Sequence, residues 1–309
     1  MESEIPVKVM KEIFATTKDG DVEILNIIVD YSCKAHDTDI SWLTISDKKG
    51  RSPLHLAATY GHVNIVNFAW KELIASTTSK KLRKQYVDMT DFKGRTALFN
   101  ASAKGYGEVV YYLINRDINL EVPTNENHVS PGSTALMASA ERNTLECFEL
   151  LMDAGANILA QRKDRADALY LAAKNGNNDI IRFLGVNDYI GPVINRESFH
   201  GRTAILTASL NGHLETCKVL LEYGAKLNYQ DKDKFTAVIF AANEGHESIV
   251  KWLVANGADI YRKDKHGASA LATALAQGHN KIVSFLLKVQ RIMENGGDLD
   301  DLAKLATST

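Results

Sequence analysis

The fold of this chain is decided by one stretch that occurs three times, as TAILTASLNGHLETCKVLLEYGA (residues 203–225), TAVIFAANEGHESIVKWLVANGA (236–258) and SALATALAQGHNKIVSFLL (269–287). The three copies begin 33 residues apart. Self-similarity at a period of about 20 to 50 residues is the signature of a repeat architecture, in which each unit packs on its neighbours. The period therefore has to be established before any domain is assigned.

The same frame continues towards the N-terminus. Further copies begin at Asp167, Thr134, Thr96 and Ser52, which leaves insertions of 3, 0, 5 and 11 residues between units of 33. A weaker copy begins at Ile13. We therefore predict a degenerate N-terminal capping repeat and about seven full repeats. The predicted boundaries are 1–46 for the cap, then 47–90 (with an insertion), 91–128, 129–161, 162–197 (with an insertion), 198–230, 231–263, and 264–309 for the last repeat with the C-terminal cap and tail.

Each unit predicts two short helices. Leu54, Leu56 and Ala57 give the first helix one apolar stripe, and Ile65 and Val66 begin the stripe of the second. A residue that tolerates positive φ stands between the two helices, where we expect it to close the first one in the left-handed conformation. This residue is Gly20, Gly61, Gly105, Asn143, Gly176, Gly212, Gly245 or Gly278.

The pattern T-A/P-L-x-x-A-A-x-x-G-H-x-x-I-V-x-x-L-L-x-x-G-A resembles the ankyrin repeat over roughly residues 5 to 293. The resemblance implies an all-α solenoid of helix-turn-helix units joined by β-turn fingers, with the fingers and first helices on the concave side. The sequence departs from the family pattern in its fingers, since the usual fingertip glycine is replaced by Arg165 and Lys234. The usual Pro before Leu is kept only at Pro53. These departures concern single turns rather than the fold.

The composition excludes several classes of protein. A chain of 309 residues with 45% hydrophobic residues and five prolines can bury a large core. Its net charge of −2 does not demand a nucleic-acid or membrane partner. No apolar run approaches the about 18 residues of a transmembrane helix, and MESEIPVKVM lacks the apolar core of a signal peptide. We expect a monomeric, intracellular, cytoplasmic protein, with the nucleus as the alternative.

The cysteines and histidines predict neither a disulfide framework nor a metal site. Cys33, Cys147 and Cys217 are widely spaced, and the last two fall on the inward stripe of second helices, where burial raises a thiol pKa. Four histidines follow the helix-closing glycine, one per repeat, which is too far apart for one zinc ion, so we expect each to bond nearby backbone. These are His62, His213, His246 and His279. No catalytic motif occurs, so we expect no catalytic residue, no cofactor, no metal and no enzymatic activity.

A binding surface follows from the resemblance, because contacts of ankyrin repeats usually come from the fingertips and the exposed ends of the first helices. At these positions Lys and Arg outnumber Asp and Glu by 12 to 4. We predict that an acidic peptide or protein surface binds there, with aromatic anchors and the strongest charge in the first two repeats. The alternative is that the fingertip lysines only keep the array soluble. The predicted partner-binding residues are Lys48, Lys49, Arg51, Tyr60, Phe92, Lys93, Arg95, Lys104, Arg142, Lys174, Phe199, Arg202 and Phe235.

The insertions distinguish this chain from a regular array. The cluster Lys80–Lys84 reads either as a nuclear-import or phosphate-binding patch or as a solvated helix extension and loop. Residues 123–132 predict a plain longer finger loop. Within residues 185–197, Gly185 and the Gly191-Pro192 pair predict a break in a second helix, acting as a hinge or weak stacking joint, or else a surface bulge without a role.

Three functions remain open on the sequence alone. The first is a non-enzymatic adaptor or scaffold that binds another protein. The second is a regulatory or inhibitory subunit, in which the acidic tail around Asp300 and Asp301 competes for the basic face. The third is nucleic-acid or anionic-lipid binding through Lys80–Lys84. Asn228 also matches the position that asparaginyl hydroxylases modify in similar repeats.

Overall fold

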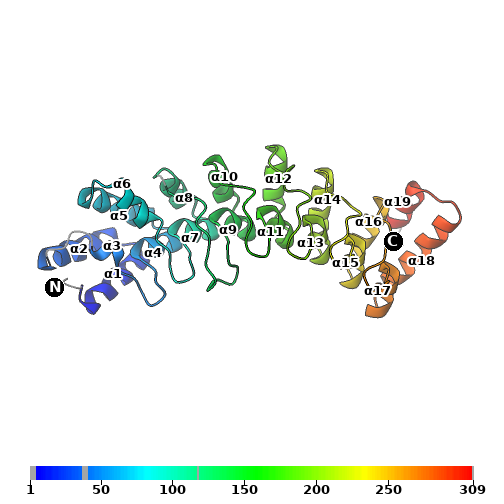
Figure 1. Ribbon diagram of the computed structural model, residues 1–309, viewed down its shortest axis with the longest axis horizontal. Helices are drawn as coiled ribbons and strands as arrows, with labels where there is room; N and C mark the ends of the chain where they lie inside the picture. The colour runs from blue at the N-terminus through cyan, green and yellow to red at the C-terminus, as the bar shows by residue number, and fades with distance from the viewer. Residues whose placement is uncertain (1–4, 37–40, 117, 308–309) are drawn as a thin grey trace. The chain divides into compact units, whose positions relative to one another are not determined.

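The computed structural model describes residues 5–36, 41–116 and 118–307, and in this part of the chain the secondary structure is helical, with no strand. The chain divides into two compact units, Met1–Lys163 and Asp164–Thr309. Figure 1 labels the helices of both. The all-α fold that the repeat pattern predicts is confirmed.

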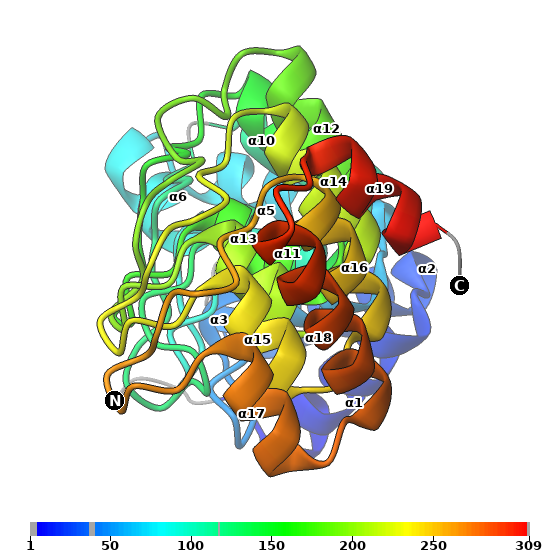
Figure 2. The same cartoon turned by 90° about the vertical axis from the view of Figure 1, so that its right-hand side faces the viewer.

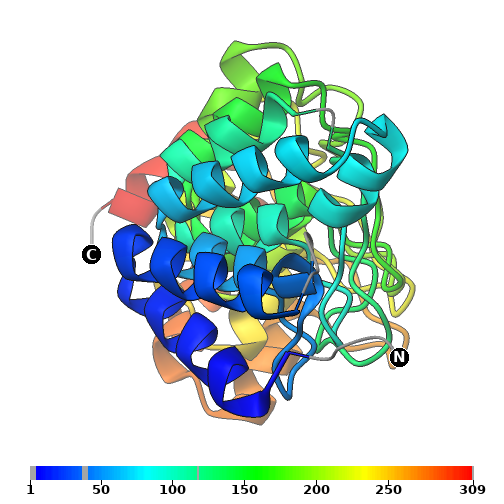
Figure 3. The same ribbon diagram turned by 90° about the vertical axis from the view of Figure 1, so that its left-hand side faces the viewer.

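Unit 1 consists of helix pairs in two layers (Figure 3). The first helices α1, α4, α7 and α9 pack side by side, and the second helices α2, α5, α8 and α10 form the other layer. The helices of this unit are α1 (Val7–Asp19), α2 (Val22–His36), α3 (Ser41–Thr44), α4 (Pro53–Tyr60), α5 (Val63–Ser76), α6 (Lys80–Val87), α7 (Ala97–Lys104), α8 (Gly107–Ile114), α9 (Ala135–Arg142) and α10 (Leu145–Asp153).

Unit 2 repeats the arrangement and ends in an additional helix (Figure 2). The last helix, α19, packs against α16 and α18, with Leu302 buried. The helices of this unit are α11 (Ala168–Asn175), α12 (Asn178–Val186), α13 (Ala204–Leu210), α14 (Leu214–Glu222), α15 (Ala237–Asn243), α16 (Glu247–Ala255), α17 (Ala270–Gln277), α18 (Asn280–Glu294) and α19 (Leu299–Thr307).

The ends of the first helices follow from local sequence. A Ser, Thr or Asp caps the N-terminus, as where the Thr96 side chain accepts a hydrogen bond from the Phe99 N–H. The predicted left-handed residues are confirmed, since the seven glycines have φ between 74° and 82° and Asn143 has φ 57°. Arg165 and Lys234 also adopt positive φ, 60° and 63°, so the two fingers that lack glycine keep the turn at a cost in backbone strain.

The predicted core thiols are confirmed where the structure describes them. Cys147 and Cys217 are fully buried on second helices, and burial raises the pKa of each thiol to about 11. Both thiols are therefore protonated at neutral pH and poor nucleophiles. The side chain of Cys33 lies outside the described residues.

Two expectations about the insertions are wrong. Gly185 does not break its helix, because α12 continues to Val186 and has the same nine residues as α10 and α14. A Cβ atom at Gly185 would lie 2.1 Å from the Tyr223 ring, so the glycine serves close packing of two second helices. The basic cluster is not an extension of α5 either, because it begins a separate helix, α6, which Ser79 caps. The hinge at 185–197 stays a prediction.

Candidate functional site

The first two fingers of unit 1 are built on an aspartate that precedes the predicted binding positions. The Asp47 carboxylate accepts hydrogen bonds from the backbone N–H of Lys49 (2.8 Å) and Arg51 (2.9 Å), and from the Arg51 guanidinium at 2.9 and 2.6 Å. Asp91 holds Arg95 in the same way, at 2.8 and 2.6 Å. Each aspartate thus fixes the turn and engages one edge of an arginine.

This arrangement changes the charge of the surface. Burial raises the pKa of the two carboxyls, but the hydrogen bonds from the arginines and the backbone outweigh it, so that the pKa of Asp47 and of Asp91 lies below its ordinary value. Both are ionised at neutral pH and neutralise Arg51 and Arg95. The excess of positive charge is therefore smaller than the counted positions indicated, because the count left out the aspartates.

The lysines of this surface carry its uncompensated charge. Lys48, Lys49, Lys93 and Lys104 are exposed, and none of the four pairs with a carboxylate in the part of the chain that the structure describes. The aromatic residues nearby are Phe92, 61% exposed, and Tyr60, 44% exposed. The Phe92 ring lies against the preceding finger, where it occupies the space that a Cβ atom on Gly50 would need.

The predicted residues of unit 2 have different roles. Lys174 and Phe199 are exposed. Arg202 pairs with Asp231 of the next finger at 3.4 Å and lies over the Phe240 ring, on which Phe235 stacks at a centroid distance of 4.9 Å. Arg202 and Phe235 therefore join two neighbouring repeats, a contact that their spacing in the sequence did not reveal.

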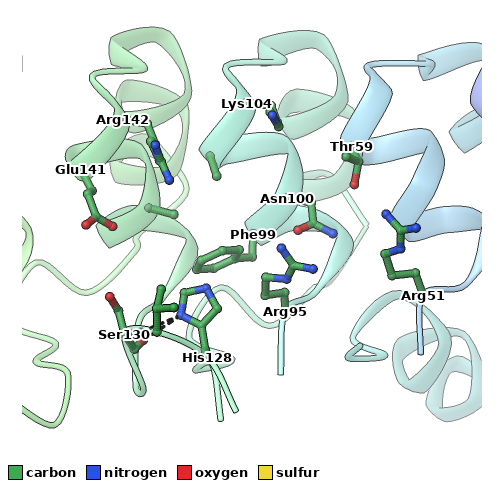
Figure 4. Close-up of a pocket in the computed structure, with 13 residues that line it drawn as sticks. Arg51, Thr59, Arg95, Phe99, Asn100, Lys104, His128, Ser130, Glu141 and Arg142 are labelled. Carbon is green, nitrogen blue, oxygen red and sulfur yellow. Dashed lines mark hydrogen bonds between the residues drawn. The ribbon is translucent and has the colours of Figure 1, made fainter. Parts of the chain in front are cut away.

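A pocket of about 370 Å³ opens in unit 1 over the ends of α4, α7 and α9 (Figure 4). It brings together four predicted residues from three repeats with residues that the sequence reasoning missed. The predicted ones are Arg51, Arg95, Lys104 and Arg142. The lining also contains Thr59, Ala103, Ser130 and Glu141, which stand at the fingertip and first-helix-end positions counted in the sequence. The missed ones are Phe99, Asn100, His128, Val129 and Ala138.

The insertion at residues 123–132 is a longer finger loop, as predicted, and its residues 128–130 form one wall of this pocket. His128 packs edge-on against Phe99, with ring centroids 5.6 Å apart, and its Nδ1 accepts a hydrogen bond from the Ser130 N–H at 3.0 Å. Burial lowers the pKa of His128, and the charges of Arg95 and Lys93 also lower it. The imidazole is therefore neutral at pH 7.

Asn100 is the other notable residue of the lining. It is 6% exposed, and its Nδ2 has no hydrogen-bond partner among the described residues. A buried donor without an acceptor costs about 1–3 kcal/mol. Leu56 and Leu171 stand at the equivalent position of other repeats. Thr207 and Thr273 stand there in two further repeats, so a polar residue at this position is not peculiar to Asn100.

The recurring histidines bond backbone, as predicted. Nε2 of His62 lies 2.7 Å from the Lys18 carbonyl, and that of His213 lies 3.0 Å from the Lys174 carbonyl. His246 and His279 make the same link to the preceding repeat. In the described ranges no three His, Cys, Asp or Glu side chains are grouped so that they could hold a metal ion.

Asn228, the predicted hydroxylation site, lies at a junction between two repeats. The Asn228 amide donates to the Gly257 carbonyl at 3.1 Å and accepts from the Asp259 N–H at 2.8 Å, so it ties two repeats together. Asn195 makes the equivalent pair of bonds. Hydroxylation of Asn228 stays a prediction.

On α6, Lys80, Lys81 and Lys84 are exposed. Among the described helices, none is both long and apolar enough to cross a membrane.

Comparison with known proteins agrees with the geometry. A family model described as ankyrin repeats in three copies matches residues 13–124, 69–162, 121–195, 185–264 and 228–295. An E3 ubiquitin-protein ligase of Arabidopsis thaliana, XBAT32, is 25% identical over 70% of this chain and 37% of its own length. The ankyrin repeat protein nuc-2 of Neurospora crassa is 26% identical over 60% of this chain and 16% of its own. The human transient receptor potential cation channel subfamily A member 1 is 31% identical over 48% of this chain and 12% of its own. The chain spans well under half the length of each.

Proposed function

Because this chain belongs to the ankyrin-repeat family, whose repeats generally mediate protein–protein interaction, we propose that it is a non-enzymatic adaptor or scaffold that binds an acidic peptide or protein surface. The binding region is the fingers and first-helix ends between residues 48 and 104. The relatives match this chain over only part of their own length, so they do not identify its partner. The proposal therefore depends on the residues of the surface.

One observation carries it: the unpaired lysines of the first two fingers flank exposed aromatic rings. Lys48 and Lys49 on one finger and Lys93 on the next are exposed and without a carboxylate partner in the described part of the chain. Phe92 lies between them, fixed against Gly50. A rigid aromatic residue surrounded by cations is the composition of an interface anchor and its rim.

The experiment selects, from a library of random peptides, those that bind to the immobilised protein, and then measures the affinity of the enriched peptides. We expect enrichment in Asp and Glu, and a loss of about tenfold in affinity at low salt for the triple variant K48E/K49E/K93E. Arg51 and Arg95 are left unchanged, because reversing their charge would leave the carboxylates of Asp47 and Asp91 without a cationic partner. The control is K263E/K281E/K288E, three exposed lysines of unit 2, which should bind as the wild type does.

Two outcomes contradict the proposal. The enriched peptides could lack acidic residues, or the triple variant could bind them with the same affinity as the wild type.

A second candidate function rests on the exposed lysines of α6. It predicts binding of generic duplex DNA or anionic vesicles that falls steeply with salt and disappears in K80E/K81E/K84E. We place it second, because Tyr86, the aromatic residue of α6, is buried and does not offer its ring to a ligand beside the three exposed lysines.

A further inference from the structure

We infer that a pocket in the layer of second helices of unit 1, here called the Tyr111 pocket, receives an arginine side chain of a basic peptide or protein. The pocket has a volume of about 360 Å³ and is lined by residues of α5, α8 and α10. Its lining combines the rings of Tyr111 and Tyr112 with the carboxylates of Glu108 and Glu146. The inference goes beyond the proposed function, which concerns the basic fingers and an acidic partner.

The second helices around this pocket are acidic. Helices α5, α8 and α10 together contain one cation, Lys71, and five carboxylates, which are Glu72, Glu108, Glu146, Glu149 and Asp153. Burial raises the pKa of the Glu72 carboxyl, and the negative charge of Asp30 on α2 raises it as well. The layer of second helices therefore attracts a cation, whereas the lysines of the fingers attract an anion.

Two of these carboxylates belong to the pocket and are available to a ligand. Glu108 and Glu146 are exposed, and neither pairs with a cation in the part of the chain that the structure describes. The Glu146 carboxylate lies over Gly107, the first residue of α8, in the space that a Cβ atom there would occupy. The glycine thus lets a carboxylate of α10 reach across to α8, where Glu108 lies in the first turn.

The aromatic residues favour an arginine over a lysine. Tyr111 is 60% exposed, and the Tyr112 ring is held in place by its hydroxyl, which donates to Asn67 Oδ1 at 2.6 Å. The protein's own Arg116 places its guanidinium over the Tyr112 ring, 3.1 Å from the centroid, and 5.4 Å from that of Trp70. A planar guanidinium stacks on aromatic rings and bonds a carboxylate through two N–H groups, unlike an ammonium group. The rings on this side of unit 1 thus already bind one guanidinium, and Tyr111 offers a further ring to a partner.

The remaining lining suits the stem of an arginine. Val63 of α5 and Leu150 of α10 are half-buried and place apolar surface beside the carboxylates. Arginine packs its methylene groups along such a surface while its charged end reaches polar partners. An arginine of a partner therefore meets apolar, aromatic and charged groups in one pocket, where a single side chain can carry much of the binding energy.

The test uses fluorescein-labelled hexaarginine as the probe and the full chain, with binding followed by anisotropy. E108Q/E146Q should weaken binding about tenfold at low salt and reduce its salt dependence, because two charges are lost from the contact. Y111A should weaken binding about fivefold without changing the salt dependence, because an uncharged ring is lost. Y111F, which keeps the ring, should bind as the wild type does.

The matched control is E244Q/E294Q, which removes two exposed carboxylates of unit 2 and should leave the affinity for hexaarginine unchanged. If E108Q/E146Q and Y111A bind hexaarginine as tightly as the wild type, the contact lies elsewhere and the inference is wrong. Binding of hexalysine as tight as that of hexaarginine would overturn the choice of a guanidinium.

The finger variant K48E/K49E/K93E separates this inference from the proposed function. It should bind hexaarginine at least as tightly as the wild type, although it loses affinity for acidic peptides. If no acidic peptide binds the wild type while hexaarginine depends on Glu108, Glu146 and Tyr111, the proposed function fails and the pocket is supported. If hexaarginine does not bind the wild type at low salt, the pocket fails and the finger surface is unaffected.

A direct measurement follows the ring proton resonances of Tyr111, assigned by their absence in Y111A. These resonances should shift when hexaarginine is added and stay in place when hexaglutamine is added. Binding of hexaarginine without any shift would exclude the Tyr111 ring from the contact.

Discussion

Single aspartates decide the shape and the charge of the fingers. Asp91 is buried, fixes the turn through the backbone N–H of Lys93 and Arg95, and holds the Arg95 side chain. Asp167, in unit 2, is also buried and caps α11 through the Tyr170 N–H, but Arg196, the cation with which it pairs, is 3.7 Å away. The two carboxylates therefore respond to pH in opposite directions.

The pKa of Asp91 in the folded state lies below its ordinary value of 3.8, because its hydrogen bonds outweigh the effect of burial. Its stabilisation is complete above about pH 4 and is lost as the pH falls through the lower folded value. We expect D91N to unfold more easily than the wild type at pH 7, by about 1–3 kcal/mol. Urea denaturation between pH 7 and pH 3 should show this difference shrinking towards acid. If the difference in unfolding free energy between D91N and the wild type did not change with pH, the ion pair of Asp91 with Arg95 would contribute nothing to stability.

Burial raises the pKa of Asp167 to about 6. Its protonated form is favoured on folding, so its contribution is fully present below about pH 4 and is lost as the pH rises through 6. We expect D167N, which keeps the cap without the charge, to be more stable than the wild type at pH 7 by about 1 kcal/mol. The two proteins should converge near pH 4 in the same urea titration. Lower stability of D167N at pH 7 would show that the Arg196 pair outweighs the cost of burial.

At the scale of the helices, the insertions alter packing rather than the helix pairs themselves. The helix α12 has its full length, and its glycine admits the Tyr223 ring of α14's C-terminal cap. The helix α6 adds a basic surface beside α5, anchored by Tyr86 and Val87, which are buried. Insertions of this kind are tolerated because each repeat contacts only its neighbours.

We expect G185A to destabilise unit 2 by about 1–3 kcal/mol, because the added methyl group overlaps the Tyr223 ring, despite the helix propensity of alanine. In a protein that already carries Y223A, adding G185A should cost much less stability than it does in the wild type. The matched control is G107A in α8, where a methyl group meets only the flexible end of Glu146. Equal effects of G185A with and without Tyr223 in thermal denaturation would contradict the packing role.

For the whole molecule, the question is whether the acidic tail regulates binding. The tail forms α19, whose Leu302 is 4% exposed and whose Asp301 lies 3.7 Å from Lys304. Leu302 lines a pocket together with Val254, Val289 and Met293, which are apolar residues of α16 and α18. The tail is thus part of the folded end of unit 2.

We expect deletion of residues 296–309 to lower the melting temperature of unit 2, because it exposes apolar side chains of α16 and α18. The affinity for acidic peptides should stay the same in the truncated protein. Both quantities can be measured on one preparation by calorimetry and anisotropy. An increase in affinity of several-fold on truncation would instead support the regulatory alternative, in which the tail competes with the ligand.

Much of this protein could be predicted from the sequence by itself. The repeat, the left-handed residues such as Asn143, the buried thiols and the histidine links all depend on neighbours at a constant distance along the chain. Periodic apolar residues determine which face of each helix is buried, and stacking then follows from the repetition.

The pocket over the ends of α4, α7 and α9 was decided only by the tertiary structure. Its lining comes from three repeats and an insertion, and its charge depends on which arginines the aspartates hold. His128 was assigned to a plain loop because turn-forming residues predict a turn without predicting where its tip will pack. Such contacts are set by side-chain packing between residues at irregular spacing, and no period in the sequence records them.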